Sequence, residues 1–150
     1  MGRRHGRIAS FTAPGGAALS RLLLDTTFLI DAERAGTSAH DAIADDDEVA
    51  VAAVTIAELV AGVHLAEAKW RAARRRFVSR ILDEVPVLPY DLAVAAAHGD
   101  LLAATRRSGR PRGAHDLIIA ATARAAHRIV VTADPGAFAG LPGVTCRCHR

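Results

Sequence analysis

Short apolar runs alternate along the chain with longer stretches in which apolar residues recur at helical spacing. The short runs are rich in Leu, Val, Ile and Ala, which is typical of strands buried on both faces. They predict four strands, and a fifth near Val144, over residues 22–24, 49–54, 85–88 and 129–131. Pro86 and Pro89 flank the third run, so that strand is expected to be short or at a sheet edge.

The longer stretches predict helices between the strands. They are expected from residue 27, over residues 38–44, from residue 55, and over residues 67–82, 91–107 and 116–126. Strands that alternate with helices indicate an α/β fold, a three-layer α/β/α sandwich with a central parallel sheet. The chain carries neither G-x-G-x-x-G nor a Walker loop, so nothing supports dinucleotide or nucleoside triphosphate binding.

Composition agrees with one domain of this kind. The chain has 150 residues, of which 51% are hydrophobic and only 4% aromatic, and small aliphatic residues suit helices packed closely on a parallel sheet. Charged residues make up 23%, which argues against a disordered chain. No apolar run approaches the roughly 20 residues that span a membrane, so a cytoplasmic protein is expected.

The two ends of the chain are expected to contribute little. Residues 1–20 combine an Arg-rich start with Gly, Ala, Pro and Ser, and we interpret them as a flexible extension or a misassigned start before a domain over residues 21–150. Near the other end, Cys146 and Cys148 lie beside His149. Two cysteines make a weak zinc site, so a frayed, reduced terminus is the favoured interpretation.

Four acidic residues lie where a strand is expected to meet a helix: Asp25, Glu58, Asp116 and Asp134. In a parallel sheet these junctions lie along one edge, so the four carboxylates are expected to converge. Crowded carboxylates repel each other, and a hard divalent cation relieves that repulsion. The pattern therefore indicates a metal-dependent active site.

Each acid also has a purely structural interpretation. Thr55 and Glu58 fit the S/T-x-x-E capping box, and Asp25 is placed to cap the helix that follows it. Asp116 suits the first turn of a helix, and Asp134 suits a turn before Pro-Gly. Taken together, however, these interpretations leave four acids on one edge, and the only lysine, Lys69, lies within a helix. The joint placement favours function.

Oxygen ligands limit the chemistry of such a site. They favour Mg²⁺, or Mn²⁺ in its place, over zinc. A water held by the cation can attack phosphorus while the cation stabilises the leaving oxygen. The hydroxyls of Thr26, Thr27 and Thr132 adjoin the acids and are candidates for orienting a carboxylate or a water.

The chain has a net charge of +3 and carries 18 Arg but only one Lys. Many of the arginines fall into two groups along the sequence. Arg71, Arg74, Arg75, Arg76 and Arg80 fall on one expected helix, where a solvated face is the favoured interpretation. The second group, Arg106, Arg107, Arg110 and Arg112, precedes Asp116. Arginine suits bidentate phosphate contacts, so we predict that Arg107, Arg110 and Arg112 contact the phosphate groups of a substrate.

The acids stand in four motifs, D-T-T-F-L-I-D, T-I-A-E-L-V-A-G, H-D-L-I-I-A-A-T-A and V-T-A-D-P-G-A-F. In this order the motifs resemble PIN-domain nucleases, and they are most similar to the VapC toxins of bacterial toxin–antitoxin pairs, over about residues 22–145. The resemblance implies a Mg²⁺-dependent endoribonuclease with Asp25, Glu58, Asp116 and Asp134 as catalytic acids. It marks Asp25 and Asp116 as direct metal ligands.

The resemblance also implies partners: an RNA substrate, a VapB-like antitoxin, a second copy of the chain in a homodimer, and a hetero-oligomer with the antitoxin. The apolar residues around Leu59, Val60 and Val63 are the expected antitoxin groove. In the fourth motif Ala137 stands where the family often carries a further acid, which leaves Asp134 as the only acid there. Asp31, which also fits the family pattern, is interpreted as part of the helix or as a support for the ligands.

Two other functions stay open at this point. A phosphatase with Asp25 as nucleophile would normally carry a second Asp where this chain has Thr27, and a Lys near the phosphoryl group. A catalytically inactive PIN-like module that binds RNA or protein is the second alternative. The retained acids argue against it, because a module without catalysis has no reason to keep them together.

Overall fold

Five parallel strands form one sheet in the computed structural model, which describes residues 19–37 and 43–149. The order of the strands across the sheet is β3-β2-β1-β4-β5. Their bounds are β1 Arg21–Leu24, β2 Glu48–Ala52, β3 Val87–Leu88, β4 Ile129–Thr132 and β5 Cys146–Cys148. As predicted, β3 is short and lies at an edge.

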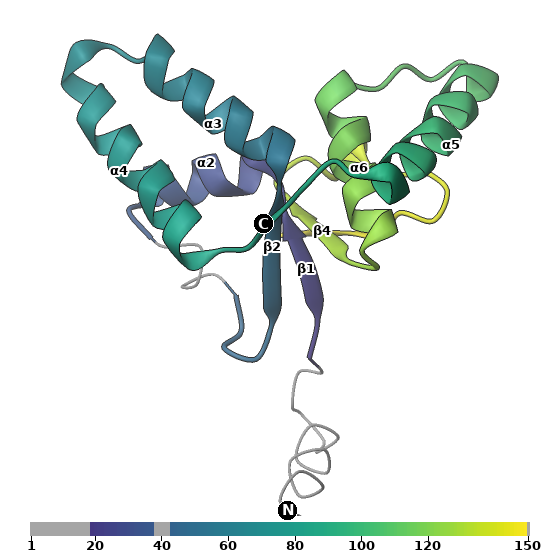
Figure 1. Cartoon of the computed structure of the whole chain (residues 1–150), viewed down its shortest axis with the longest axis horizontal. Helices are drawn as coiled ribbons and strands as arrows, with labels where there is room; N and C mark the ends of the chain where they lie inside the picture. The colour runs from purple at the N-terminus through teal and green to yellow at the C-terminus, as the bar shows by residue number, and fades with distance from the viewer. Residues whose placement is uncertain (1–18, 38–42, 150) are drawn as a thin grey trace, which may run out of the picture.

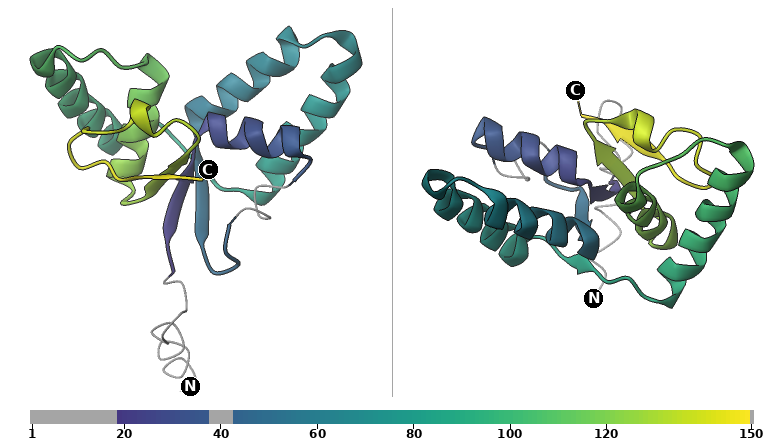
Figure 2. Two further views of the ribbon diagram at one scale, coloured as in Figure 1. Left: turned by 180° about the vertical axis from the view of Figure 1, so that it is seen from behind. Right: turned by 90° about the horizontal axis from the view of Figure 1, so that it is seen from above.

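Helices cover both faces of the sheet (Figure 1). One face carries α2, α3 and α4, and the other carries α5 and α6, as the views from behind and above also show (Figure 2). Their bounds are α2 Thr26–Ala35, α3 Ala53–Leu65, α4 Ala68–Glu84, α5 Leu92–Ser108 and α6 Ala114–Ala125, with a 3-10 turn, η2, over Pro135–Ala137. The predicted three-layer α/β/α sandwich is confirmed.

Two hydrophobic cores form because successive strand residues point to opposite faces. On β1, Leu22 and Leu24 join the cluster under α2, α3 and α4, while Leu23 joins the cluster under α5 and α6. All three side chains are fully buried. This explains why the strand is continuously apolar, with no polar alternation.

The start of α3 differs from the prediction. The helix begins at Ala53, two residues before the expected start, because β2 ends at Ala52 and alanine favours helix as soon as the chain leaves the sheet. Thr55 therefore lies inside the helix, and the N-cap position is held by Ala52 without a side-chain bond. The capping-box interpretation of Glu58 is wrong.

The C-terminal tail is also more ordered than predicted. Cys146–Cys148 forms β5, which pairs in parallel with β4, so the frayed terminus is wrong for these residues. Val144 and Cys146 both pack against the α5–α6 core, since cysteine behaves as a small hydrophobic residue. Both cysteines are free thiols.

Some predictions fall on other parts of the chain. Most of the predicted extension and most of the predicted helix over residues 38–44 lie outside the described residues. Of the helices that the structure describes, none combines the length and apolar character needed to cross a bilayer.

The connections that follow β1 and β4 leave the sheet toward opposite faces. Helix α2 follows β1 on one face, whereas η2 and β5 follow β4, and Phe138 just after η2 packs into the core of the other face. Such a switch in direction opens a crevice at the carboxyl ends of the strands. The residue after β1, Asp25, is tied to β4 by its backbone N–H, which donates to the Val131 carbonyl at 3.1 Å.

The first prediction concerns Thr55, which is fully buried and whose hydroxyl has no hydrogen-bond partner among the described residues. Thr55→Val keeps the shape and removes the unsatisfied hydroxyl, so the free energy of unfolding is expected to rise by about 1 kcal/mol. Urea denaturation measures it.

Thr122→Val is the matched control, since Thr122 is equally buried but donates to the Ile118 carbonyl at 2.7 Å. It is expected to leave stability unchanged or lower it. Equal stabilisation by the two variants would contradict the assignment of Thr55 as unsatisfied.

Candidate active site

Asp25 is fixed at the centre of the crevice. Its side chain is almost fully buried, and its Oδ1 accepts the Phe28 backbone N–H at 2.9 Å and the Thr27 hydroxyl at 2.8 Å. Asp25 is thus the N-cap of α2, and the structural interpretation made from the sequence is confirmed. The cap holds the carboxylate in one orientation, which a ligand role also requires.

Two threonine hydroxyls connect Asp25 to the segment after β4. The Thr27 hydroxyl lies 3.3 Å from that of Thr132 and accepts the Ala133 N–H at 3.1 Å. Thr132, in turn, accepts the Asp134 N–H at 2.9 Å. The chain around Asp134 is therefore tied to the helix that Asp25 caps.

Glu58 links two helices across the crevice. Its Oε1 accepts the Thr26 hydroxyl at 2.9 Å, and its Oε2 lies 3.6 Å from Nδ1 of His115, at the start of α6. The bond from Thr26 takes the place of the capping box expected from the sequence. Glu58 is held facing Asp116 rather than folded back onto its own helix.

The charges of the other three acids act on Asp116. It lies in the first turn of α6 and is partly buried. Burial raises the pKa of Asp116 above its ordinary value, and the negative charges of Glu58, Asp25 and Asp134 raise it further, while His115 lowers it. Glu58, Asp25 and Asp134 therefore all lie within electrostatic reach of Asp116.

The pKa of Asp25 is raised as well. Burial raises the pKa of its carboxyl group, against the lowering effect of hydrogen bonds from Thr132, the Phe28 N–H and Thr27 and of the charge of His149. Desolvation therefore exceeds the stabilisation that the donors provide. Both carboxylates would gain from a nearby positive charge.

Asp134 is the most exposed of the four acids and occupies the N-cap position of η2. Its side chain makes no capping bond there, so the turn does not engage the carboxylate. The predicted turn is present, and the carboxylate still acts on the pKa of Asp116.

The donor set fits a hard cation with few direct protein ligands. Among the described residues, no three His, Cys, Asp or Glu side chains are spaced to enclose one ion. Mg²⁺ usually keeps several waters and binds through one or two carboxylates. Asp25 and Asp116, whose pKa values are raised by burial, are the candidates for those one or two carboxylates.

The arginines before Asp116 divide into two kinds. Arg107 and Arg110 are exposed, so their predicted phosphate contacts remain sterically open. Arg112 instead donates through Nη1 to the Gly136 carbonyl at 2.5 Å and through Nη2 to the Ala139 carbonyl at 2.6 Å. Arg110 and Arg112 line a shallow cleft of about 560 Å³ together with Asp116 and Asp134.

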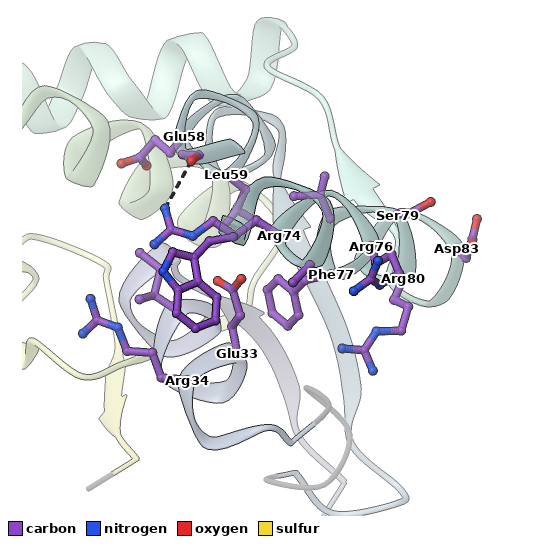
Figure 3. Close-up of a pocket in the computed structure, with 15 residues that line it drawn as sticks. Glu33, Arg34, Glu58, Leu59, Arg74, Arg76, Phe77, Ser79, Arg80 and Asp83 are labelled. Atoms are coloured by element: carbon purple, nitrogen blue, oxygen red, sulfur yellow. Dashed lines mark hydrogen bonds between the residues drawn. The ribbon is translucent and has the colours of Figure 1, made fainter. Parts of the chain in front are cut away.

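A larger groove of about 1070 Å³ lies between α2, α3 and α4. Figure 3 shows Arg74, Phe77 and Arg80 along α4, with Glu33 and Arg34 approaching from α2. Of the three residues expected to form a groove, Leu59 lines it, while Val63 belongs to the core beneath and Val60 lies outside its lining. Because Glu58 also lines it, the groove reaches the acidic site.

The sequence interpretation missed His149. Its backbone N–H donates to the Thr132 carbonyl at 3.2 Å, and its ring lies edge-on to Phe28 with centroids 4.9 Å apart. Nε2 lies 3.4 Å from Oδ2 of Asp31, which gives Asp31 a contact near the site. His149 directly follows β5, and the alternation of Val144 and Cys146 with polar residues is the pattern that indicates that strand.

Comparison with known proteins finds similarity over nearly the whole described chain. The family model of the PIN domain matches residues 22–143. The tRNA(fMet)-specific endonuclease VapC of Shigella flexneri is 35% identical over 99 residues, which cover 65% of this chain and 72% of that protein. Ribonuclease VapC10 of Mycobacterium tuberculosis is 34% identical over 105 residues, which cover 68% and 74%.

Among solved structures, the chain resembles VapBC-5 of Mycobacterium tuberculosis, a member of the VapBC family of toxin–antitoxin systems. The TM-score is 0.70 at 31% identity, and the match covers 85% of this chain and 97% of that one.

The raised pKa values give a prediction for stability. The folded state keeps a proton on Asp116 to higher pH than the unfolded chain does, so the stability due to this group is full below the ordinary pKa of 3.8. It is lost as pH rises through the raised pKa. In metal-free protein, Asp116→Asn is expected to reduce this loss, as measured by urea denaturation from pH 4 upward.

Asp46→Asn, a change in an exposed turn, is the control and is expected to follow the parent. Parallel pH profiles for the parent and Asp116→Asn would contradict the account of crowded charges.

Proposed function

The chain belongs to the PIN-domain family, within the group of VapC-type ribonucleases, and from this premise we propose that it is a Mg²⁺-dependent endoribonuclease. We propose further that it is the toxic component of a toxin–antitoxin pair. The observation that carries the proposal is that Asp25, Glu58 and Asp134 lie within electrostatic reach of Asp116, with Glu58 and the segment of Asp134 held by hydrogen bonds with threonine hydroxyls. Four acids from separate elements converge with no lysine among them, and a divalent cation is the natural counter-charge.

The chain's residues divide the work in this proposal. Asp25 and Asp116 hold the cation, with Mn²⁺ able to replace Mg²⁺, and Glu58 and Asp134 orient waters. When bound, the cation activates a water toward phosphorus and stabilises the leaving oxygen. Thr26 positions Glu58, whereas Thr27 and Thr132 hold Asp25 and the segment of Asp134.

The substrate assignment rests on charge beside the acids. Arg110 lines the same cleft as Asp116 and Asp134, and Arg107 lies exposed near the end of α5. Guanidinium groups there attract a phosphate backbone into a site whose acids would otherwise repel it. An RNA chain is the substrate that this arrangement and the family together support.

Neither alternative function suits the geometry as well. For a phosphatase, Thr27 stands where a second Asp is needed, and its hydroxyl is bonded to Asp25. The Nζ atom of Lys69, on α4, lies 3.4 Å from Oε2 of Glu67. Lys69 does not line the acidic cleft. An inactive binding module would carry the cost of the clustered acids without using them.

The groove between α2, α3 and α4 supports an antitoxin partner. Leu59, Trp70 and Phe77 supply apolar lining, and arginines of α4 lie along its length. An amphipathic helix of a VapB-like antitoxin fits such a groove. Since Glu58 belongs both to the groove and to the acidic site, an occupant would reach the catalytic acids and block them.

Exposed apolar residues also support self-association into a homodimer, and hetero-oligomers when the antitoxin binds. Tyr90 and Leu92 follow the edge strand β3 and are 50% and 86% exposed. A second copy covering this region would bury them. Light scattering of the purified chain measures the oligomeric state.

The central prediction is that RNA cleavage in Mg²⁺ requires Asp25 and Asp116. Asp25→Asn and Asp116→Asn each keep the side-chain size but remove a ligand charge. A loss of about 100-fold or more in cleavage rate is expected, equivalent to about 3 kcal/mol. A fluorescent RNA assay measures it, with circular dichroism to establish that each variant is folded.

Asp46→Asn serves as the control and is expected to cut as fast as the parent. Parent-like cleavage by both active-site variants would refute the mechanism. Mg²⁺ or Mn²⁺ should also raise the melting temperature of the parent more than that of either variant, which an inactive module without a metal site would not show.

For the antitoxin, the groove predicts an effect of Ala73→Glu. Ala73 lines the groove, and a glutamate there places a charge against the apolar face of the docking helix. We expect binding of the antitoxin encoded beside this chain to weaken by about tenfold or more, equivalent to about 1.4 kcal/mol, measured by calorimetry.

Ala72→Glu makes the same change on the neighbouring residue of α4, which is exposed but does not line the groove. Binding should be retained there. If both variants bind like the parent, the antitoxin docks elsewhere.

A further inference from the structure

The loop between α5 and α6 is hydrogen-bonded to the turn that follows Asp134. Arg112, in that loop, donates from Nη1 to the carbonyl of Gly136 and from Nη2 to that of Ala139. These carbonyls lie in and just after η2. One side chain therefore joins its loop to two residues that lie 24 and 27 positions later in the sequence.

The segment that accepts these hydrogen bonds is short, and a hydrogen bond holds its other end as well. The Asp134 N–H donates to the Thr132 hydroxyl at 2.9 Å, which fixes the chain where β4 ends. Arg112 fixes it again after η2. Asp134 thus lies between two anchors, and its own side chain makes no capping bond that would hold the turn.

Gly113, the residue after Arg112, leaves room for the Asp116 carboxylate because it has no side chain. A Cβ atom on Gly113 would lie 2.7 Å from Oδ2 of Asp116 and 3.4 Å from its Cγ. Such a contact is too close, so a side chain at position 113 would force the Asp116 carboxylate to move. The φ angle of Gly113 is −57°, which alanine adopts without strain, so the requirement for glycine here is spatial.

We propose that Arg112 and Gly113 are positioning residues of the carboxylate site, with Arg112 setting the place of Asp134 and Gly113 setting the place of Asp116. The inference rests on the proposed metal-dependent function. It gives Arg112 a role different from the phosphate contact predicted from the sequence, because its two terminal nitrogens already serve carbonyl groups. Arg110, two residues earlier, retains the exposed position that a phosphate contact needs.

Gly113→Ala tests the spatial part through metal binding. The added methyl group displaces the Asp116 carboxylate, and the affinity for Mn²⁺, measured by calorimetry without RNA, is expected to fall by about 10- to 100-fold. Gly99→Ala is the matched control, because a Cβ on Gly99, in α5, meets nothing within 4 Å. Its Mn²⁺ affinity should equal that of the parent.

Arg112→Gln tests the two hydrogen bonds that hold the turn. Losing the paired bonds should speed amide hydrogen exchange at Ala137, Phe138 and Ala139, whose N–H groups bond within the turn, by about tenfold. Mn²⁺ affinity should fall as well. Arg75→Gln makes the same charge change at an exposed position of α4 that does not line the acidic cleft, and both quantities should stay at parent values.

The outcomes separate this inference from the function on which it rests. If the parent binds Mn²⁺ with an affinity that Asp116→Asn abolishes, but Gly113→Ala and Arg112→Gln bind like their controls, the positioning roles are wrong and the metal site stands. If the parent binds no Mn²⁺, the proposed function itself fails. Weaker binding in both variants, with parent-like controls, supports the inference.

Discussion

Electrostatic repulsion of Asp116 by three other carboxylates is the constraint on which the rest of the site depends. Burial raises the pKa of Asp25 and of Asp116, and for Asp116 the charges of the other three acids raise it further. Neutral pH makes this arrangement costly for the metal-free protein, because charged groups are kept close and partly out of water. A divalent cation reverses the sign of the interaction. Under the proposed function, the feature that destabilises the metal-free fold is therefore the one that would bind the ion.

The fold bears that cost because the acids stand on a rigid framework. The strands that support them are buried on both faces, and β1 lies between β2 and β4, so Asp25 emerges at the centre of the sheet. Neighbouring hydroxyls then fix the surroundings: Thr26 holds Glu58, while Thr27 and Thr132 connect Asp25 with the segment of Asp134. The precision of the site comes from these short polar links on a tightly packed scaffold.

The sequence predicted the layers, the first four strands and the convergence of the acids, because these follow from local apolar patterns and from parallel topology. It could not predict contacts between distant side chains. The Thr26–Glu58 bond spans 32 residues, and the capping-box motif indicated a different partner. The bonds of Arg112 depend on where two loops meet, which no local pattern encodes. Strand β5 was underestimated because its apolar positions are cysteines, whose burial depends on the partner strand.

The most direct test of the account is a crystal structure of the protein grown with Mn²⁺, with the ion located by its anomalous scattering. We expect a single strong peak between Asp25 and Asp116, at roughly 2.1 Å from a carboxylate oxygen of each, as for a hard cation of this size. Glu58 and Asp134 should reach the ion through waters. A peak that lies elsewhere, or four carboxylates with no ion at saturating Mn²⁺, would contradict the claim that their repulsion creates a metal site.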